Sequence, residues 1–223
     1  MDLSKELVIR REQPADYATV EQVVREAFWN VYTPACTEHY LLHIMRDHPA
    51  FVPELDMLAL VGEKIAGSVV YMRSFILACN GIRYETLTLG PIAVLPEYQR
   101  QGVGRSLISQ SRELARRMGF RAILLCGDPD YYLGQGFVPA ETYGICNSEG
   151  LYMEGLHACE LYEGALADAG GRYHEEDIYN VDEAAAQAFD RQFPPKEIVV
   201  GTPSQRRFAE VVASVSPHSL HQG

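Results

Sequence analysis

Long apolar runs, paired cysteines and an excess of basic residues are all missing from this chain of 223 residues. No segment approaches the roughly 20 apolar residues that a membrane-spanning helix needs, and the charged start is unlike a signal peptide. The five cysteines are an odd set without Cys-x-x-Cys spacing, which argues against a disulfide framework and a zinc site. We therefore expect a cytoplasmic protein with reduced thiols, no membrane contact and no metal.

Negative charge dominates the chain, because 30 acidic residues stand against 19 Lys and Arg. The excess lies C-terminally: residues 141–223 hold 14 acidic and five basic side chains, a difference of nine. This balance predicts that nucleic acid is not a partner, since nucleic-acid binding needs clustered Lys and Arg. It would attract a cationic amine, although a solvated acidic face is the simpler explanation.

The most informative stretch runs from Thr86 to Ser106. The apolar run Leu89–Val94 predicts a buried strand that stops before Pro96, and residues 99–104 (Gln-Arg-Gln-Gly-Val-Gly) lead into an amphipathic helix. Unpaired N–H groups at a helix start, with glycines that allow close approach, make an anion site. An ordinary strand-to-helix loop is the alternative explanation for the two glycines alone.

The helix after this turn is well specified and ends at Gly119. Its apolar stripe comprises Leu107, Ile108, Ser111, Leu114, Ala115 and Met118. Residues 122–126 then predict a second buried strand. Two common phosphate motifs fit badly: Arg105-Ser106 replaces the Lys-Ser/Thr pair of a P-loop, and Leu107 stands where a dinucleotide fingerprint has its third glycine.

These residues resemble the GNAT superfamily of acyl-CoA-dependent N-acyltransferases. The acetyl-CoA signature of that family, Gln/Arg-x-x-Gly-x-Gly/Ala, is matched by Gln99, Gly102 and Gly104. Its second signature, an aromatic pair followed by Gly-Phe, is matched by residues 131–137 (Tyr-Tyr-Leu-Gly-Gln-Gly-Phe). Over roughly residues 7–162 the chain looks similar to the YhbS-like predicted bacterial acetyltransferases, whose substrates are mostly undefined.

The resemblance implies an α/β (α+β) GNAT fold, with a mixed, mostly antiparallel central sheet and helices on both faces. Residues 1–167 would form the acyl-CoA-binding catalytic domain, and residues 168–223 a C-terminal helical extension packed on it. The expected elements of the domain start with a strand at 7–10, helices at 14–30 and 37–46, strands at 57–61 and 64–78, and an Asn80-Gly81 hairpin.

In the extension, Gly170-Gly171 is expected to break the chain. Asn180 is the predicted cap of a helix over 181–189, and Thr202-Pro203 is expected to open a last helix that runs to about Ser214.

The donor implied by the resemblance is acetyl-CoA. By the family's pattern, the backbone of Ile92, Ala93 and Val94 pairs with the pantetheine arm like an added strand, while their side chains belong to the core. The pyrophosphate would be held by the residues of the turn and helix start, Gln99, Arg100, Gln101, Gly102, Val103, Gly104, Arg105 and Ser106. Successive N–H groups, the helix dipole and two guanidinium groups would bind it, and a Cβ at either glycine would push it away.

Tyr132 holds the place of the family's tyrosine that points at the thioester sulfur, which makes it the predicted general acid. A phenol with a pKa near 10 is protonated at neutral pH and is matched to protonating a thiolate. The alternative is that Tyr132 packs, or orders the donor, without giving a proton. Tyr131 is expected to be structural, and Asp128, before Pro129, is expected to cap a helix.

The general base is not predicted. Some relatives use a strand glutamate about eleven residues before the signature glutamine, and Thr88 stands at that place here. Glu85 points the other way if the alternation is regular. Water-mediated deprotonation, or a base from Glu38 or His39 on the second helix, are the alternatives. His39 and His43 also have the spacing of a zinc pair, but no third ligand accompanies them.

We therefore expect direct transfer of an acetyl group to an amine of a small molecule or protein in a ternary complex, by a monomer or homodimer. A non-catalytic acyl-CoA-binding sensor or interaction protein on the same fold is the alternative, motivated by the missing strand carboxylate. A nucleotide-binding oxidoreductase is a distant third.

Overall fold

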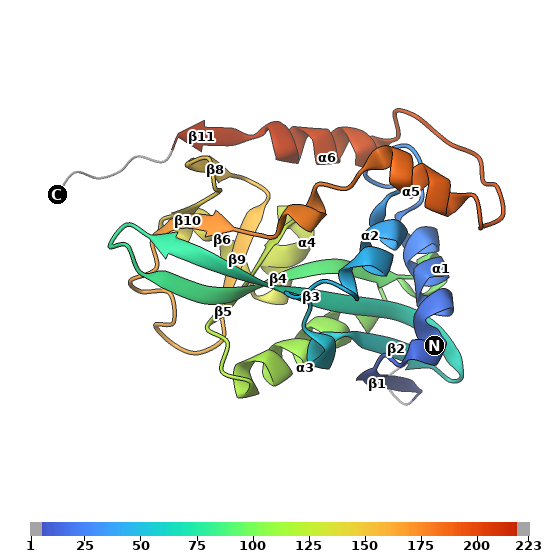
Figure 1. The fold of residues 1–223 in the computed structure, drawn as a ribbon, viewed down its shortest axis with the longest axis horizontal. Helices are drawn as coiled ribbons and strands as arrows, with labels where there is room; N and C mark the ends of the chain where they lie inside the picture. Colours follow the sequence, from blue (N-terminus) through green and yellow to red (C-terminus); the bar gives the residue numbers. More distant parts are fainter. Residues whose placement is uncertain (1–5, 218–223) are drawn as a thin grey trace. The chain divides into compact units, whose positions relative to one another are not determined.

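The computed structural model describes residues 6–217 of the chain (Figure 1). These residues form two compact units. The first holds the residues up to Tyr71 together with 90–111 and 177–206, and the second holds 72–89, 112–176 and the residues from Arg207 on. Four elements contribute residues to both units: β3 (Lys64–Ala78), β4 (Arg83–Val94), α3 (Val103–Arg117) and α6 (Pro203–Ala213).

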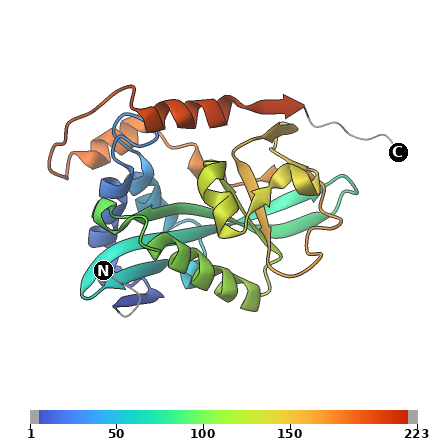
Figure 2. The same ribbon diagram turned by 180° about the vertical axis from the view of Figure 1, so that it is seen from behind.

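The first unit is built on an antiparallel arrangement of β1 (Leu7–Arg11), β2 (Met57–Val61) and the beginning of β3. Its helices are α1 (Tyr17–Phe28), α2 (Glu38–Met45) and α5 (Glu183–Asp190). Figures 1 and 2 show α1 and α2 packed side by side. The spacing predicts that Val20, Val23, Val24, Ala27 and Phe28 of α1 face inward; the first four are buried, whereas Phe28 is half-buried. These side chains supply the apolar face that holds the helix in place.

Strands β3 and β4 approach each other very closely where β4 leaves the sheet. A Cβ added to Gly67 of β3 would lie 2.5 Å from the carbonyl oxygen of Ala93 in β4. Leu95 N–H, just after β4, donates to Ala66 O at 2.9 Å. The glycine therefore fixes the position of the end of β4, from which the predicted phosphate turn departs.

The second unit contains a mixed sheet. β5 (Ala122–Cys126) pairs in parallel with β4 and antiparallel with β9 (Leu156–Glu160), which also pairs with β6 (Val138–Pro139). β10 (Gly171–His174) pairs antiparallel with β3 and parallel with β7 (Ile145–Cys146), and β8 (Leu151–Met153) pairs with β11 (Val215–Pro217). Helix α4 (Pro129–Tyr132) follows β5. The core includes Ile76, Leu124, Ile145, Leu156, Leu166 and Tyr173.

The predicted fold class, a mixed and mostly antiparallel sheet with helices, is confirmed. The strands predicted at 57–61 and 64–78 have the predicted bounds, and Gly81, with a φ of 81°, makes the predicted hairpin turn. Between residues 6 and 217, no helix is both long enough and apolar enough to cross a membrane. The division of the chain at residue 167 stays a prediction.

Three local predictions were wrong. Met118 was placed on the buried stripe of α3, but it is 36% exposed, because the helix ends at Arg117 before the stripe completes its turn. Asn180 does not cap α5; the cap is Asp182, whose carboxylate accepts the N–H groups of Ala184 and Ala185. Gly170-Gly171 does not simply break the chain, because Gly171 begins strand β10.

Gly171 is needed for that strand to pair. A Cβ added to it would lie 2.2 Å from Leu77 O and 2.6 Å from the Cα of Ala78, both backbone atoms of β3. Glycine within a strand often marks such a close approach of another backbone. The lack of a side chain at Gly171 therefore allows β10 to pair with β3 at this close distance.

Candidate functional site

The predicted phosphate turn has a backbone shape suited to anions. Arg100, an exposed non-glycine residue, has a φ of 58°, and Gly102 has a φ of 88°. Turn conformations that include left-handed residues can direct successive N–H groups into an anion-binding concavity. A left-handed non-glycine residue such as Arg100 costs about 1–3 kcal/mol, and such residues cluster at ligand clamps. Arg100 therefore holds a conformation that its residue type disfavours, whereas Gly102 holds one that glycine adopts readily.

Helix α3 begins directly after this turn. Its first turn closes with Ser106 N–H donating to Gly102 O at 2.9 Å, so the N–H groups of Val103, Gly104 and Arg105 precede the intrahelical hydrogen bonds. Val103 is 1% exposed, so it offers a ligand its backbone and not its side chain. Because Ser106 uses its N–H within the helix, it would contribute through its hydroxyl.

Two glutamines of the turn hold the backbone rather than extend away from it. Gln99 Nε2 donates to Val94 O at 3.0 Å, and Gln101 Nε2 donates to Glu97 O at 2.6 Å. The signature glutamine thus ties the turn to the end of β4. Sequence reasoning placed it among the donor-binding residues, and the structure gives it a clear positioning role.

Gly102 keeps the space beside the turn open. A Cβ added there would meet no heavy atom within 4 Å, so the left-handed φ, and not crowding within the protein, requires glycine. The exposed Arg100 and Arg105 add positive charge. These features fit a pyrophosphate, which takes backbone N–H groups and guanidinium groups as donors.

The predicted pantetheine-pairing backbone lies at the end of β4. The register of β4 with β5 covers Leu87 and Thr88, and Ile92, Ala93 and Val94 lie beyond it on the same strand. Ala93 is buried as expected, whereas Ile92 and Val94 are half-buried.

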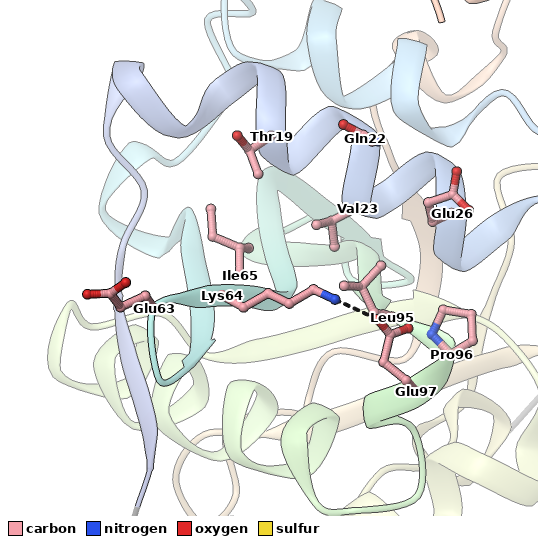
Figure 3. A pocket seen from close by; sticks show the side chains of 10 residues that line it. All are labelled: Thr19, Gln22, Val23, Glu26, Glu63, Lys64, Ile65, Leu95, Pro96 and Glu97. Carbon is pink, nitrogen blue, oxygen red and sulfur yellow. Dashed lines mark hydrogen bonds and ion pairs between the residues drawn. The ribbon is translucent and has the colours of Figure 1, made fainter. Parts of the chain in front are cut away.

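A pocket of about 560 Å³ lies beside the start of the turn, between α1, the beginning of β3 and residues 95–97. Figure 3 shows Lys64 joined to Glu97 by an ion pair of 2.7 Å, with Glu26 on the α1 side. Its lining carries Glu26, Glu63 and Glu97 against the single cation Lys64. This charge suits a cationic group better than a phosphate.

Tyr132, in the second unit, is 7% exposed and closes the short helix α4. Phe137 packs edge-on against its ring at 5.8 Å between centroids, and the ring of His157 lies at 6.2 Å. A Cβ added to Gly127 would lie 2.2 Å from the Tyr132 ring. Gly127 therefore lets the tyrosine ring lie directly on the backbone at the end of β5.

The second signature has a local structural explanation. Asp128 caps α4 as predicted, because its carboxylate accepts the N–H of Asp130 at 3.1 Å, and Arg207 of α6 binds the same carboxylate at 3.2 Å. Gly136, with a φ of 83°, ends the 3-10 turn that follows, and Phe137 then enters the core. The motif therefore builds the wall that holds the Tyr132 ring.

His157 of β9 lies close to Tyr132 but is fully buried. Its Nδ1 lies 2.8 Å from Gly155 O, which favours the tautomer with hydrogen on that nitrogen. Burial lowers the pKa of His157 below its ordinary value. The side chain is thus a neutral imidazole at physiological pH.

A polar chain that the sequence did not indicate runs from Thr88 to Glu175 in the second unit. Thr88 Oγ1 and Tyr173 Oη form a short hydrogen bond, and Tyr173 also hydrogen-bonds to the carboxylate of Glu175. We call these three residues the Glu175 relay. The surrounding protein partly desolvates the Glu175 carboxylate and so raises its pKa, although the side chain reaches solvent, and the hydrogen bond from Tyr173 opposes that shift. The alternation of β10, with Tyr173 and Glu175 two residues apart, could have indicated the pair had the strand been recognised.

A second polar cluster lies in the first unit, between α1, α2 and α5. Asp190 Oδ1 receives Arg25 Nε at 2.6 Å, lies 3.0 Å from His39 Nε2, and Cys36 Sγ lies 3.5 Å from His39 Nδ1. We call these four residues the Arg25 cluster. His39 is 0% exposed, which argues against it as a base for an external substrate.

His39 and His43 have the spacing of a zinc-binding pair, but their side chains do not face a common site. His39 faces Asp190, whereas His43 Nδ1 lies 2.9 Å from Glu21. Within the part of the chain that the structure describes, no group of three or more His, Cys, Asp or Glu side chains could hold a metal ion.

Comparison with known proteins identifies the family of this chain. The model of the acetyltransferase (GNAT) family matches residues 21–135. The uncharacterized N-acetyltransferase YhbS of Escherichia coli is 26% identical over 173 residues, which is 76% of this chain and 97% of that protein. The uncharacterized N-acetyltransferase YjhQ of the same organism is 36% identical over 89 residues, 39% of this chain and about half (48%) of YjhQ.

Solved structures show the same fold. The crystal structure of Escherichia coli YhbS in complex with CoA superposes with a TM-score of 0.68 at 22% identity, covering 79% of this chain and 93% of that one. A GNAT family acetyltransferase from Brucella melitensis in complex with acetyl-CoA gives a TM-score of 0.61 at 24% identity, covering 78% and 97%.

Proposed function

Because this chain belongs to the acetyltransferase (GNAT) family, we propose that it transfers an acetyl group from acetyl-CoA to an amine of a small molecule or protein. The transfer would occur by direct attack in a ternary complex, with Tyr132 as the general acid. The observation that carries the proposal is the turn before α3, where Arg100 and Gly102 are left-handed and the helix presents its first N–H groups.

The residues proposed to hold the donor follow from that turn. The N–H groups of residues 102–105 and the side chains of Arg100 and Arg105 would bind the pyrophosphate, supported by the helix dipole. The backbone of Ile92–Val94 would pair with the pantetheine arm. Acetyl-CoA supplies the activated thioester when it is bound. The YhbS and Brucella melitensis structures, which hold CoA and acetyl-CoA, support this assignment.

Tyr132 is proposed to protonate the leaving sulfur from its phenolic oxygen. Its ring is fixed by Gly127 and Phe137, which restricts the directions in which the hydroxyl can point. A positioned acid of this kind contributes about 10²- to 10⁴-fold in rate. We infer further that the partner is a free amine and not a nucleic acid or a membrane, and that the protein acts as a monomer or homodimer.

The test measures CoA binding by calorimetry, and release of free CoA thiol from acetyl-CoA with a panel of amines (spermidine, lysine, tyramine and glucosamine). Tyr132→Phe is expected to keep the affinity for CoA and to lose about 100-fold in kcat. Tyr131→Phe, the same change on the exposed neighbour, is the matched control. CoA binding without turnover of any amine would favour the acyl-CoA sensor instead, and an unimpaired Tyr132→Phe would remove Tyr132 from its role.

A further inference from the structure

We propose that Glu175 is the general base of this transfer, held in place by Tyr173 and Thr88 as positioning residues. The inference rests on the proposed function and supplies the group that the sequence leaves open. Strand β4 has Thr88 where some relatives have a carboxylate. In this chain, Thr88 leads through Tyr173 to a carboxylate on another segment.

The relay has a defined direction. Tyr173 hydrogen-bonds to the Glu175 carboxylate, which has no proton to give when ionised, so Tyr173 Oη donates and its oxygen accepts from Thr88 Oγ1–H. Thr88 and Tyr173 are 2% and 5% exposed, while Glu175 is exposed to solvent. A buried two-residue scaffold thus carries a carboxylate that a substrate can reach.

Glu175 lies near the end of β5, the strand that leads to the proposed acid. The thiol of Cys126, the exposed last residue of β5, has a pKa raised to about 12, first by desolvation from the surrounding protein and second by the charge of Glu175. Gly127 follows Cys126 and lies against the Tyr132 ring. The charge of Glu175 and the ring of Tyr132 thus each act on one of two adjacent residues, Cys126 and Gly127, where β5 ends.

The groups around Glu175 define how it titrates. Cys126 faces it from β5 and Tyr173 from β10. His174 lies on the other face of β10, where it stacks on Phe75 at 4.8 Å between ring centroids, and burial lowers its pKa. Arg172 and Arg83 act on His174. Desolvation raises the pKa of Glu175 above its ordinary value, which is the direction that makes a carboxylate a stronger base.

The proton balance closes with these two residues. A Glu175 oxygen takes one proton from the substrate ammonium and passes it to solvent. The freed nitrogen electron pair forms the N–C bond while the C–S bond breaks and its electron pair goes to sulfur. Tyr132 Oη protonates that sulfur, and the remaining proton lost by the nitrogen returns to the Tyr132 oxygen through solvent.

The first test is independent of turnover. Glutamate side-chain carboxyls are labelled with ¹³C in the full chain, and Glu175 is assigned by its absence in Glu175→Gln. Its carboxyl is expected to titrate above 4.5, and to titrate higher still in Tyr173→Phe, because the lost hydrogen bond stabilised the charged form. A Glu175 carboxyl that titrates at or below 4.5, or one that Tyr173→Phe leaves in place, would overturn the relay.

The second test is the pH dependence of kcat/KM with the fastest amine of the panel, which stays protonated below about pH 8 if its pKa is near that of lysine. The kcat/KM of the wild type is expected to rise with pH and then level off. In Glu175→Gln, kcat/KM should fall about 100-fold at pH 7 and should keep rising with pH, because without the base only the unprotonated amine reacts. In Tyr173→Phe, kcat/KM should begin to rise at a higher pH than in the wild type. Above that pH, the loss in kcat/KM should be smaller.

Two matched variants separate the outcomes. Glu149→Gln, the same change on an exposed turn, should leave the profile unchanged, and Glu38→Gln tests the other carboxylate that the sequence offers. An active wild type whose profile changes with Glu38→Gln but not with Glu175→Gln overturns the assignment alone. A wild type that binds CoA but acetylates no amine overturns the proposed function together with its base.

Discussion

The Arg25 cluster and the Glu175 relay are both polar groups in apolar surroundings, but they differ in whether a member of the group reaches solvent. In the Arg25 cluster, Asp190 is bound by Arg25 through both oxygens, and the imidazole and thiol beside it are buried. In the relay, the buried hydroxyls lead to a carboxylate that meets solvent. A closed cluster can fasten an element, whereas an open one can also exchange a proton with a substrate.

The Arg25 cluster superficially has the order of a cysteine nucleophile, a histidine and an aspartate. Its electrostatics point the other way. Burial raises the pKa of Cys36 and lowers that of His39, so both stay neutral, and the reactive form of cysteine is the thiolate. The cluster joins α5 to α1 and α2 and is structural.

The largest effect is expected from opening the closed cluster. Asp190→Ala would leave the Arg25 guanidinium, 2% exposed, without its carboxylate. Breaking a buried pair in this way costs about 3–5 kcal/mol in the free energy of unfolding. Urea denaturation measures it. Glu113→Ala, which breaks exposed pairs on α3, is the control and should change little; equal losses would contradict the difference between the two kinds of pair.

A smaller but broader effect is expected at the strand that carries the relay. Gly171→Ala would force a Cβ into backbone atoms of β3, which cannot give way as a flexible side chain would. We expect a loss of about 1–3 kcal/mol, together with reduced acetyl transfer because Tyr173 and Glu175 follow directly. Thermal unfolding and thiol release report the two effects. In Gly134→Ala the new Cβ meets no atom within 4 Å, so stability should be kept.

The helix that carries Asp190 depends on its cap. Asp182→Ala removes the acceptor for two N–H groups at the start of α5 and should cost about 1 kcal/mol. Asn180→Ala, at the cap that the sequence predicted, should be close to neutral. If the Asn180 variant were the more destabilised of the two, the assignment of the cap would be reversed.

The smallest effect is a difference in pH dependence. The pKa of Glu175 is raised in the folded protein, so its contribution to stability is complete below the unfolded value near 4.5 and is lost as pH rises through the folded value. Glu175→Gln should therefore gain stability relative to the wild type as pH rises from 4 to 8. His39 has the opposite sign: its pKa is lowered by burial, so its protonation on acidification below about 6.5 favours unfolding. Urea midpoints at several pH values measure both.

Several features were predictable from the sequence because they depend on neighbours along the chain. The strand, turn and helix around Gly102 follow from apolar spacing and from glycine and proline positions, and the cap at Asp128 follows from the residue pair Asp128-Pro129. The matched signatures also indicated the family, which the model match over residues 21–135 shows. Tyr132 as acid stays a prediction, as does each donor-binding residue.

The features that escaped the sequence depend on contacts between distant segments. Gly170-Gly171 was interpreted as a break because glycine weakens an isolated strand. The backbone of β3 that pairs with Gly171 lies about ninety positions earlier in the chain. Asn180 was predicted as the cap because the helix was expected to begin at residue 181, whereas α5 begins at Glu183 and is capped by Asp182. Met118 has the spacing of the buried stripe of α3, but the helix ends at Arg117, one residue before it.

By itself, the sequence determined the glycine-containing turn before α3, the helix behind it and the tyrosine motif, since each is encoded in a short run of residues whose backbone preferences act locally. The tertiary structure alone decided that Thr88, on one strand, meets Tyr173 on another and so leads to Glu175. That contact follows from strand pairing across a sheet, where residues 85 positions apart become neighbours. Local preferences specify no such pairing, because it depends on which surfaces the whole chain buries.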